Sequence, residues 1–222
     1  MIYLPKSQPA PPCLEKEKAK ANGTYNCQNV LARLQADFKN KCYLCEQKAP
    51  TTINIEHFIP HQGNLDLKFD WLNLFYACGH CNNTKLAKYG DILNCTIAED
   101  RVETSIRYWM NPYPKEKVEV TARIDNAAVT ETASLLDDIY NGTTTLKLIE
   151  SANIRNQILQ EVNKFQKLLL DFYHDLATAQ ERETLRAKIA KELSDRSSFT
   201  AFKRWIIRNN PELQADFHEY LP

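Results

Sequence analysis

Two Cys-x-x-Cys pairs constrain this chain more than any other feature of its 222 residues. Cys42-Tyr-Leu-Cys45 and Cys78-Gly-His-Cys81 have 32 residues between them. A two-residue spacing lets both thiolates of a pair face one ion with tetrahedral geometry. We therefore expect the four cysteines to hold a structural zinc ion, because four protein thiolates leave no coordination position open. The intervening stretch is longer than in a simple zinc ribbon, so it must carry structure of its own.

Other interpretations of these cysteines remain open. They could be two unrelated pairs, or one pair could be a redox motif, although a redox pair usually opens a helix in a βαβ context that is missing here. His80 could replace one cysteine as a ligand, but a residue inside such a motif is more often a spacer.

The other three cysteines, Cys13, Cys27 and Cys95, are expected to be free thiols. The total of seven is odd, and the first twelve residues lack the apolar core of a secretory signal. Both observations favour a reducing compartment, so we expect a cytoplasmic protein.

The charge balance limits how the chain can bind nucleic acid. It has 28 Lys and Arg residues against 28 Asp and Glu residues. A uniformly basic surface is excluded, and any nucleic-acid contact must come from a local patch. No apolar run approaches the roughly 18 residues that span a bilayer, so we expect no membrane contact.

Local patterns predict short elements in the first half of the chain and long helices in the second. The expected elements are an extended arm over 1–23, a helix over 25–39, strands over 53–58 and 71–77, a helix over 82–88, a hairpin within 91–130, and helices over about 154–176, 179–193 and 198–210. The prediction is an α+β protein with an arm and helix over 1–40, a zinc-stapled core over 41–93, and a hairpin region with a helical domain over 94–222.

Polar residues that could perform hydrolysis lie between the cysteine pairs and just after them. Glu56 and His57 are adjacent at the end of the first expected strand, although neighbours in a strand point to opposite faces unless the strand ends there. Asn82 is expected at a helix start. A carboxylate, an amide oxygen and water suit Mg²⁺ or Mn²⁺, and a nearby imidazole could deprotonate a water. Each piece alone is weak, since an Asn at a helix start is most often a cap.

The combined pattern C-x2-C … E-H-x-x-P … N-L … C-x2-C-N-x-x-K, over roughly residues 40–90, resembles the zinc-stapled HNH endonucleases. Their core is the ββα-metal or His-Me finger. The resemblance implies that His57 is the general base, Glu56 and Asn82 are ligands of a catalytic Mg²⁺ or Mn²⁺, and Asn73 fixes the loop between the strands. Lys85 and Lys88 on the helix would bind nucleic acid, with DNA favoured over RNA.

A looser resemblance extends to about residue 155. Asn111-Pro-Tyr, the hairpin after it, Thr145-Leu-Lys and Asn153-Ile-Arg155 follow the order seen in PtuB-like nuclease subunits of Septu anti-phage systems. This resemblance implies an ABC-type ATPase partner (PtuA-like).

The helical half offers weaker signals. Lys203, Arg204 and Arg208 could bind phosphates, but a solvated face is the more usual role for such residues. The apolar stripe over 154–176 could bind a partner helix, although core packing is more usual. His61 could assist the site, but a loop histidine is usually exposed.

The predicted function is metal-dependent hydrolysis of nucleic-acid phosphodiesters. The alternatives are a non-catalytic zinc module that binds nucleic acid or protein, and a redox protein that uses one Cys-x-x-Cys pair.

Overall fold

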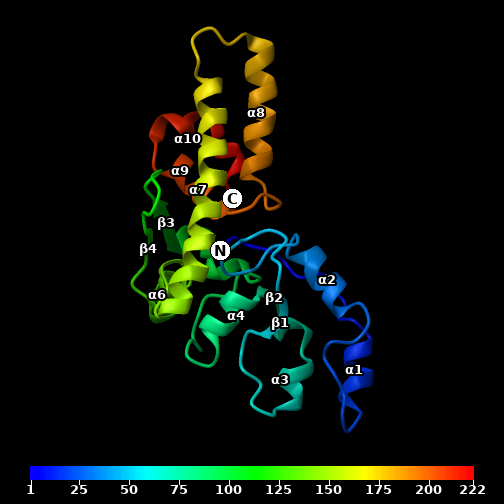
Figure 1. Cartoon of the computed structure of the whole chain (residues 1–222). Coiled ribbons are helices and arrows are strands. Elements are labelled where there is room, and N and C mark those ends of the chain that lie inside the picture. The colour runs from blue at the N-terminus through cyan, green and yellow to red at the C-terminus, as the bar shows by residue number, and fades with distance from the viewer.

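A computed structural model describes all of residues 1–222 and has mixed α and β structure (Figure 1). The elements of its first half are α1 (Cys13–Lys18), α2 (Val30–Asp37), β1 (Ile53–His57), α3 (Leu65–Phe69), β2 (Leu74–Cys78), α4 (Gly79–Lys85), α5 (Val102–Ser105), β3 (Ile106–Met110) and β4 (Val118–Ala122). The elements of its second half are α6 (Ala127–Asn141), α7 (Thr145–Phe172), α8 (Ala179–Leu193), α9 (Thr200–Arg208) and α10 (Pro211–Phe217). Three short 3-10 turns, Trp71–Asn73, Ala98–Asp100 and His218–Tyr220, complete the chain.

The stretch between the cysteine pairs folds as strand, loop and strand, and a helix follows it. β1 and β2 are antiparallel, with a register running from Ile53 opposite Cys78 to His57 opposite Leu74. Both expected strands are confirmed, although the second begins at Leu74 because a 3-10 turn precedes it. α4 begins before Asn82 because Cys78 caps it, its Sγ accepting from the Cys81 N–H. Asn82 is therefore not a cap but lies inside the helix.

The expected hairpin after this core is confirmed as the antiparallel pair β3 and β4. α6 packs against β4 and was not predicted. Asn126 caps this helix by accepting from the Val129 N–H. Asn is favoured both in turns and at helix N-caps, so residue type alone does not separate the two.

The last part of the chain forms an antiparallel pair of long helices, α7 and α8, with α9 and α10 packed beside them (Figure 1). α8 has the predicted bounds. The apolar stripe on α7 is buried as expected from Ile154 to Phe172, but Leu176 lies beyond the helix and is 84% exposed. Ser197 and Ser198 do not cap α9, which starts after Phe199 in a left-handed conformation with φ of 50°.

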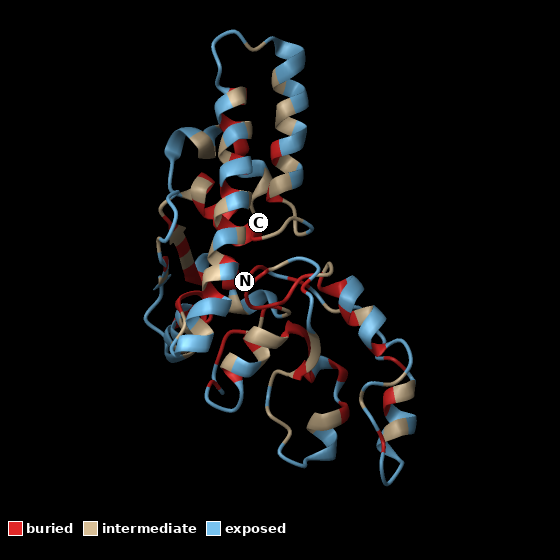
Figure 2. Cartoon of the chain, viewed as in Figure 1, coloured by how far each residue is buried: buried red, intermediate tan, exposed pale blue.

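One apolar core of 41 buried residues runs from Met1 to Trp205 and joins all three predicted segments, and a second of seven lies among α7–α10. Figure 2 shows the buried residues concentrated where the two halves meet. The N-terminal arm is not a loose appendage, because Met1, Ile2 and Leu4 are buried in the main core. The sequence did not predict this burial, because apolar residues interrupted by prolines show neither a helical nor a strand periodicity.

The expectation of three free thiols outside the cluster is wrong for two of them. Cys13 and Cys27 form a disulfide with a Cα–Cα distance of 6.1 Å, whereas Cys95 is free and buried. Helix α1 and the turn before α2 bring the two sulfurs together, which an odd cysteine count could not indicate. No helix combines the length and apolar character needed to cross a bilayer.

Candidate metal centre and active site

The four predicted zinc ligands lie together in the fold. The sulfur atoms of Cys42, Cys45, Cys78 and Cys81 all lie within 4.8 Å of one another. Cys45 Sγ and Cys78 Sγ are 3.9 Å apart. A tetrahedral ion with metal–sulfur bonds of about 2.3 Å places its ligands roughly 3.8 Å apart, so the spacing fits such an ion.

Electrostatics in the cluster favour a divalent cation. The four side chains are buried, and no lysine, arginine or histidine pairs with them. Hydrogen bonds from neighbouring thiols hold the pKa of Cys78 far below its usual value, whereas contacts within the cluster and burial raise the pKa of Cys45 and of Cys81. A metal ion would stabilise all four as thiolates.

His80 does not belong to the metal set. Its Nδ1 lies 2.7 Å from Glu150 Oε2, and its Nε2 donates to the Ile139 carbonyl at 2.8 Å. Lys147 also pairs with Glu150 at 2.8 Å. Both ring nitrogens are therefore used to join the cysteine cluster to α6 and α7, and the alternative of a His80 ligand is wrong.

Asn73 holds the segment between the strands in place. Its Oδ1 accepts from the Ile59 N–H at 2.7 Å, and its Nδ2 donates to the carbonyls of Ile59 and Leu67, both at 2.9 Å. The side chain is buried, so these bonds have little competition from water. This geometry fits the loop-fixing role and gives Asn73 no direct part in chemistry.

Glu56 and Lys85 form a buried ion pair between β1 and α4. Glu56 Oε1 lies 3.1 Å from Lys85 Nζ, which also donates to the Phe58 carbonyl at 2.8 Å. Burial raises the pKa of Glu56 to about 7, although the Lys85 ammonium opposes this shift. Lys85 is fully buried, so its predicted role in binding nucleic acid is wrong.

His57 is the last residue of β1, and its neighbour Glu56 faces the opposite side of the strand. Its Nε2 lies 3.0 Å from the Lys68 carbonyl, which can only accept, so Nε2 carries the proton and Nδ1 keeps its lone pair. Desolvation lowers the pKa of the half-buried imidazole and so favours its neutral form. The ring centroids of Tyr25 and His61 each lie 4.6 Å from that of His57.

Asn82 and Lys88 complete the candidate set. Asn82 lies three residues before Lys85, on the same face of α4, and is half-buried. Lys88 is largely exposed, but its Nζ is 2.8 Å from Asp138 Oδ2, and this contact raises its pKa. The Lys88 ammonium can reach solvent, but a phosphate would have to compete with Asp138 for it.

The cations of α9 are internal rather than exposed. Lys203 is buried and pairs with Glu161 at 3.2 Å and with Glu192. Arg204 Nη1 lies 2.5 Å from Glu103 Oε2, and Arg208 pairs with the same carboxylate. Both the phosphate-binding and the solvated-face interpretations are therefore wrong for Lys203 and Arg204.

Sequence reasoning missed Tyr25, whose ring contacts His57 from the segment between α1 and α2. It also missed Glu150, the partner of His80. Neither lies in a motif, and the contacts arise only when distant segments pack, so no local signal could have found them.

Comparison with known proteins finds no matching family model and no matching curated protein.

Proposed function

We propose that this protein is a metal-dependent endonuclease of the HNH type, with a structural zinc ion in the four-cysteine cluster. The observation that carries the proposal is His57, an imidazole at the end of β1 with Nε2 held by a backbone carbonyl and Nδ1 without a hydrogen-bond partner. A scaffold has no need for an imidazole oriented in this way. The order of strand, loop, strand and helix around the cysteine pairs supports the same assignment.

His57 would act as the general base. Its Nδ1 would take a proton from a water molecule while the Lys68 carbonyl keeps the ring in one tautomer and orientation. Asn73 acts indirectly, because it bonds the backbone of Ile59 and of Leu67, and Leu67 directly precedes Lys68. The resulting hydroxide would attack a phosphodiester, and the bond to the leaving oxygen would break.

Glu56 and Asn82 could hold the divalent ion of such an enzyme, on the side of β1 opposite the His57 ring. Glu56 Oε2 is buried without a hydrogen-bond partner, and the Asn82 amide lies on the helix face that bears Lys85. Carboxylate and amide oxygens suit Mg²⁺ or Mn²⁺. When bound, such an ion would stabilise negative charge on the phosphate and on the leaving oxygen. Lys85 is already paired with Glu56, and its ammonium neutralises part of the charge that the carboxylate could offer to such an ion.

The charge distribution supports a partner-dependent nuclease. Net charge is zero, and Lys85, Lys203 and Arg204 are committed to internal ion pairs. These three cations cannot bind phosphates, so the isolated chain should bind DNA weakly. We assign added DNA affinity to an ATPase subunit of an anti-phage complex in the cytoplasm, and expect slow basal nicking by the isolated chain. Tight DNA binding by the isolated chain at physiological salt would contradict this assignment.

A non-catalytic zinc module that binds nucleic acid or protein is the second candidate. It is favoured by the structural uses of three site residues, since Glu56 and Lys85 neutralise each other and Asn73 is saturated by backbone bonds. Such a module would need zinc but neither His57 nor Asn82.

Cleavage of supercoiled plasmid tests the proposal. The zinc-loaded protein, assayed with and without reductant, should nick plasmid only when Mg²⁺ or Mn²⁺ is added. Asn82→Ala should lower the rate at limiting Mn²⁺ more than at saturating Mn²⁺, and Asn83→Ala, at an exposed neighbour, serves as control. Nicking that does not depend on the added ion would overturn the proposal.

A further inference from the structure

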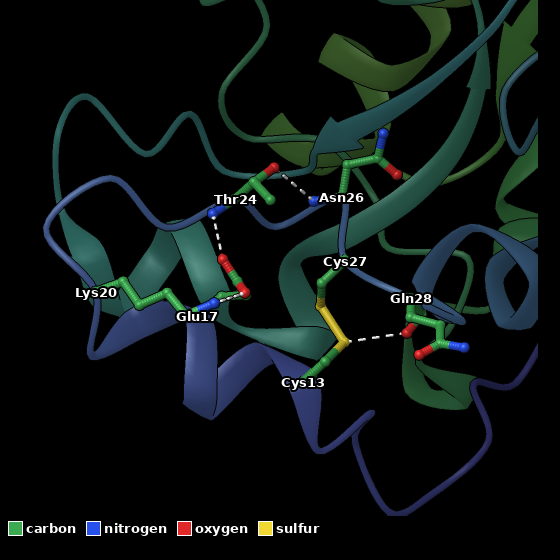
Figure 3. Close-up of a disulfide and its surroundings, with 7 residues drawn as sticks. All are labelled: Cys13, Glu17, Lys20, Thr24, Asn26, Cys27 and Gln28. Carbon is green, nitrogen blue, oxygen red and sulfur yellow. Dashed lines mark hydrogen bonds and ion pairs between the residues drawn. A yellow bond between two sulfur atoms is a disulfide. The ribbon is translucent and has the colours of Figure 1, made fainter.

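The Cys13–Cys27 disulfide closes a loop that contacts the candidate base. The two cysteines are 14 positions apart, and their bond joins the start of α1 to the turn before α2 (Figure 3). Glu17 braces the loop from inside, accepting from the Thr24 N–H at 3.1 Å and from Lys20 Nζ at 2.5 Å. Covalent closure and these bonds give the segment a defined shape.

The loop lies on the residues that orient His57. The Tyr25 ring meets the His57 ring edge-on with centroids 4.6 Å apart. The Gly23 carbonyl accepts from Lys68 Nζ at 3.0 Å, and the carbonyl of the same Lys68 accepts from His57 Nε2. Tyr25 and Gly23 therefore contact the candidate base and the residue that orients it.

The one charged contact between α1 and α3 is weak. The ion pair between Lys18 of α1 and Asp66 of α3 involves two solvent-exposed side chains. Exposed pairs of this kind contribute little, because water and salt screen them. Tyr25 and both cysteines also pack against the main apolar core, and the disulfide adds to this packing because it removes much of the conformational freedom of the loop.

We propose that the loop over residues 19–27, locked by the Cys13–Cys27 disulfide, is a redox-released lid that limits access to His57. The claim about access stands on the contacts above, and its consequence for hydrolysis rests on the proposed function. Reduction of the disulfide would free the loop, expose the His57 ring and let a phosphodiester approach.

The redox step needs a dithiol as reductant. One of its thiolates attacks a sulfur of the disulfide and forms a mixed disulfide, and its second thiol displaces the protein sulfur. Two protein thiols form, and the dithiol becomes a disulfide. Cys13 and Cys27 are half-buried, whereas the four clustered cysteines and Cys95 are buried, so the disulfide is the most accessible sulfur pair in the chain.

Site-resolved modification of histidines by diethyl pyrocarbonate tests the lid without any need for nuclease activity. The zinc-loaded wild type with its disulfide intact is compared with the Cys13→Ser/Cys27→Ser variant, and each histidine is quantified by peptide mass spectrometry. His57 should react at least about fivefold faster in the variant, because local opening of the unlocked loop uncovers its ring. His174, in the exposed turn after α7, should be unchanged.

Two further variants separate the lid from general loosening. Tyr25→Ala with the disulfide intact should also speed modification of His57, whereas Tyr25→Phe should not, since it keeps the ring. Cys95→Ser should leave the His57 rate at the wild-type value. Equal His57 rates with and without the disulfide, or free thiols at positions 13 and 27 in air-oxidised protein, would overturn the proposal. Plasmid nicking is scored separately, so loss of the nuclease claim would not alter this result.

Discussion

The cysteine-cluster core and the long helical pair are stabilised by different means. β1 and β2 have five residues each and α4 has seven, so none of them could be stable alone. The core instead relies on the four-cysteine cluster and on the main apolar core, in which every residue of β2 is buried, with the Glu56–Lys85 pair beside it. α7 and α8 have 28 and 15 residues and bury a second apolar cluster.

The difference shows what each region can be used for. In the short core, backbone and polar groups are positioned by individual bonds, so a side chain such as His57 can be held in one orientation near the surface. In the helical region, burial of apolar surface supplies stability without fixing any polar group for chemistry. His80, bonded to Glu150 of α7, joins the two regions.

Loss of the metal should produce the largest effect and should be confined to the first region. Structural zinc contributes roughly 10–16 kcal/mol in small zinc-folded units. Cys42→Ser should therefore abolish amide-exchange protection in β1, β2 and α4 while α7 and α8 stay protected. Hydrogen exchange with mass spectrometry provides the measurement.

Cys95→Ser is the matched control for that experiment, because Cys95 is equally buried but outside the cluster. It should keep one zinc per chain. If Cys42→Ser bound zinc and exchanged like the wild type, the core would not depend on the cluster.

Removing a large side chain from the second apolar cluster should have the opposite regional effect. Phe165 is fully buried there, and Phe165→Ala should cost about 3–5 kcal/mol of unfolding free energy through lost burial and a cavity. Urea denaturation provides the measurement. Zinc content should be unchanged, and Leu170→Ala, at a 73% exposed position of the same helix, should cost under about 0.5 kcal/mol.

Asn73→Ala should destabilise the core moderately. The substitution leaves the Ile59 N–H and the carbonyls of Ile59 and Leu67 without their side-chain partner. Because these groups are buried, the free energy of unfolding should fall by about 2 kcal/mol. Thermal unfolding should register the loss, with Asn83→Ala near the wild-type value. A wild-type melting temperature for Asn73→Ala would show that the segment after β1 is held by other contacts.

The smallest expected effect is a pH dependence caused by Glu56. Its pKa of about 7 in the fold lies above the ordinary 4.5, so the folded state retains a proton that the unfolded state loses. Stability from this group is therefore lost as pH rises, by about 1 kcal/mol between roughly pH 6 and pH 8. Urea denaturation of zinc-loaded protein without Mg²⁺ should show this relative to Glu56→Gln, which removes the titrating group. Parallel pH profiles of the two proteins would contradict the assignment.

The sequence predicted most of what depends on local periodicity or on motif spacing. The cysteine cluster, β1, the hairpin β3–β4 and the bounds of α8 all follow from such patterns. These features share a physical cause. Each is determined by residues close together along the chain or by residues that bind the same ion.

What the sequence could not predict depends on long-range packing. Lys85 and Lys203 looked like surface cations, but carboxylates from distant elements neutralise them inside the fold. The pairing of Cys13 with Cys27 and the contact between Tyr25 and His57 likewise need the three-dimensional arrangement of the arm. The identity of a charged residue or of a cysteine does not show which distant side chain it will pair with in the fold.

Plasmid nicking by His57→Ala tests the central claim most directly. The wild type, His57→Ala and His174→Ala are each loaded with zinc and assayed with Mn²⁺, in parallel with and without reductant. The account predicts nicking by the wild type and by His174→Ala, and a loss of about 100-fold or more in His57→Ala, the usual scale for a general base. Equal nicking by all three proteins, or none by the wild type under either condition, would contradict it.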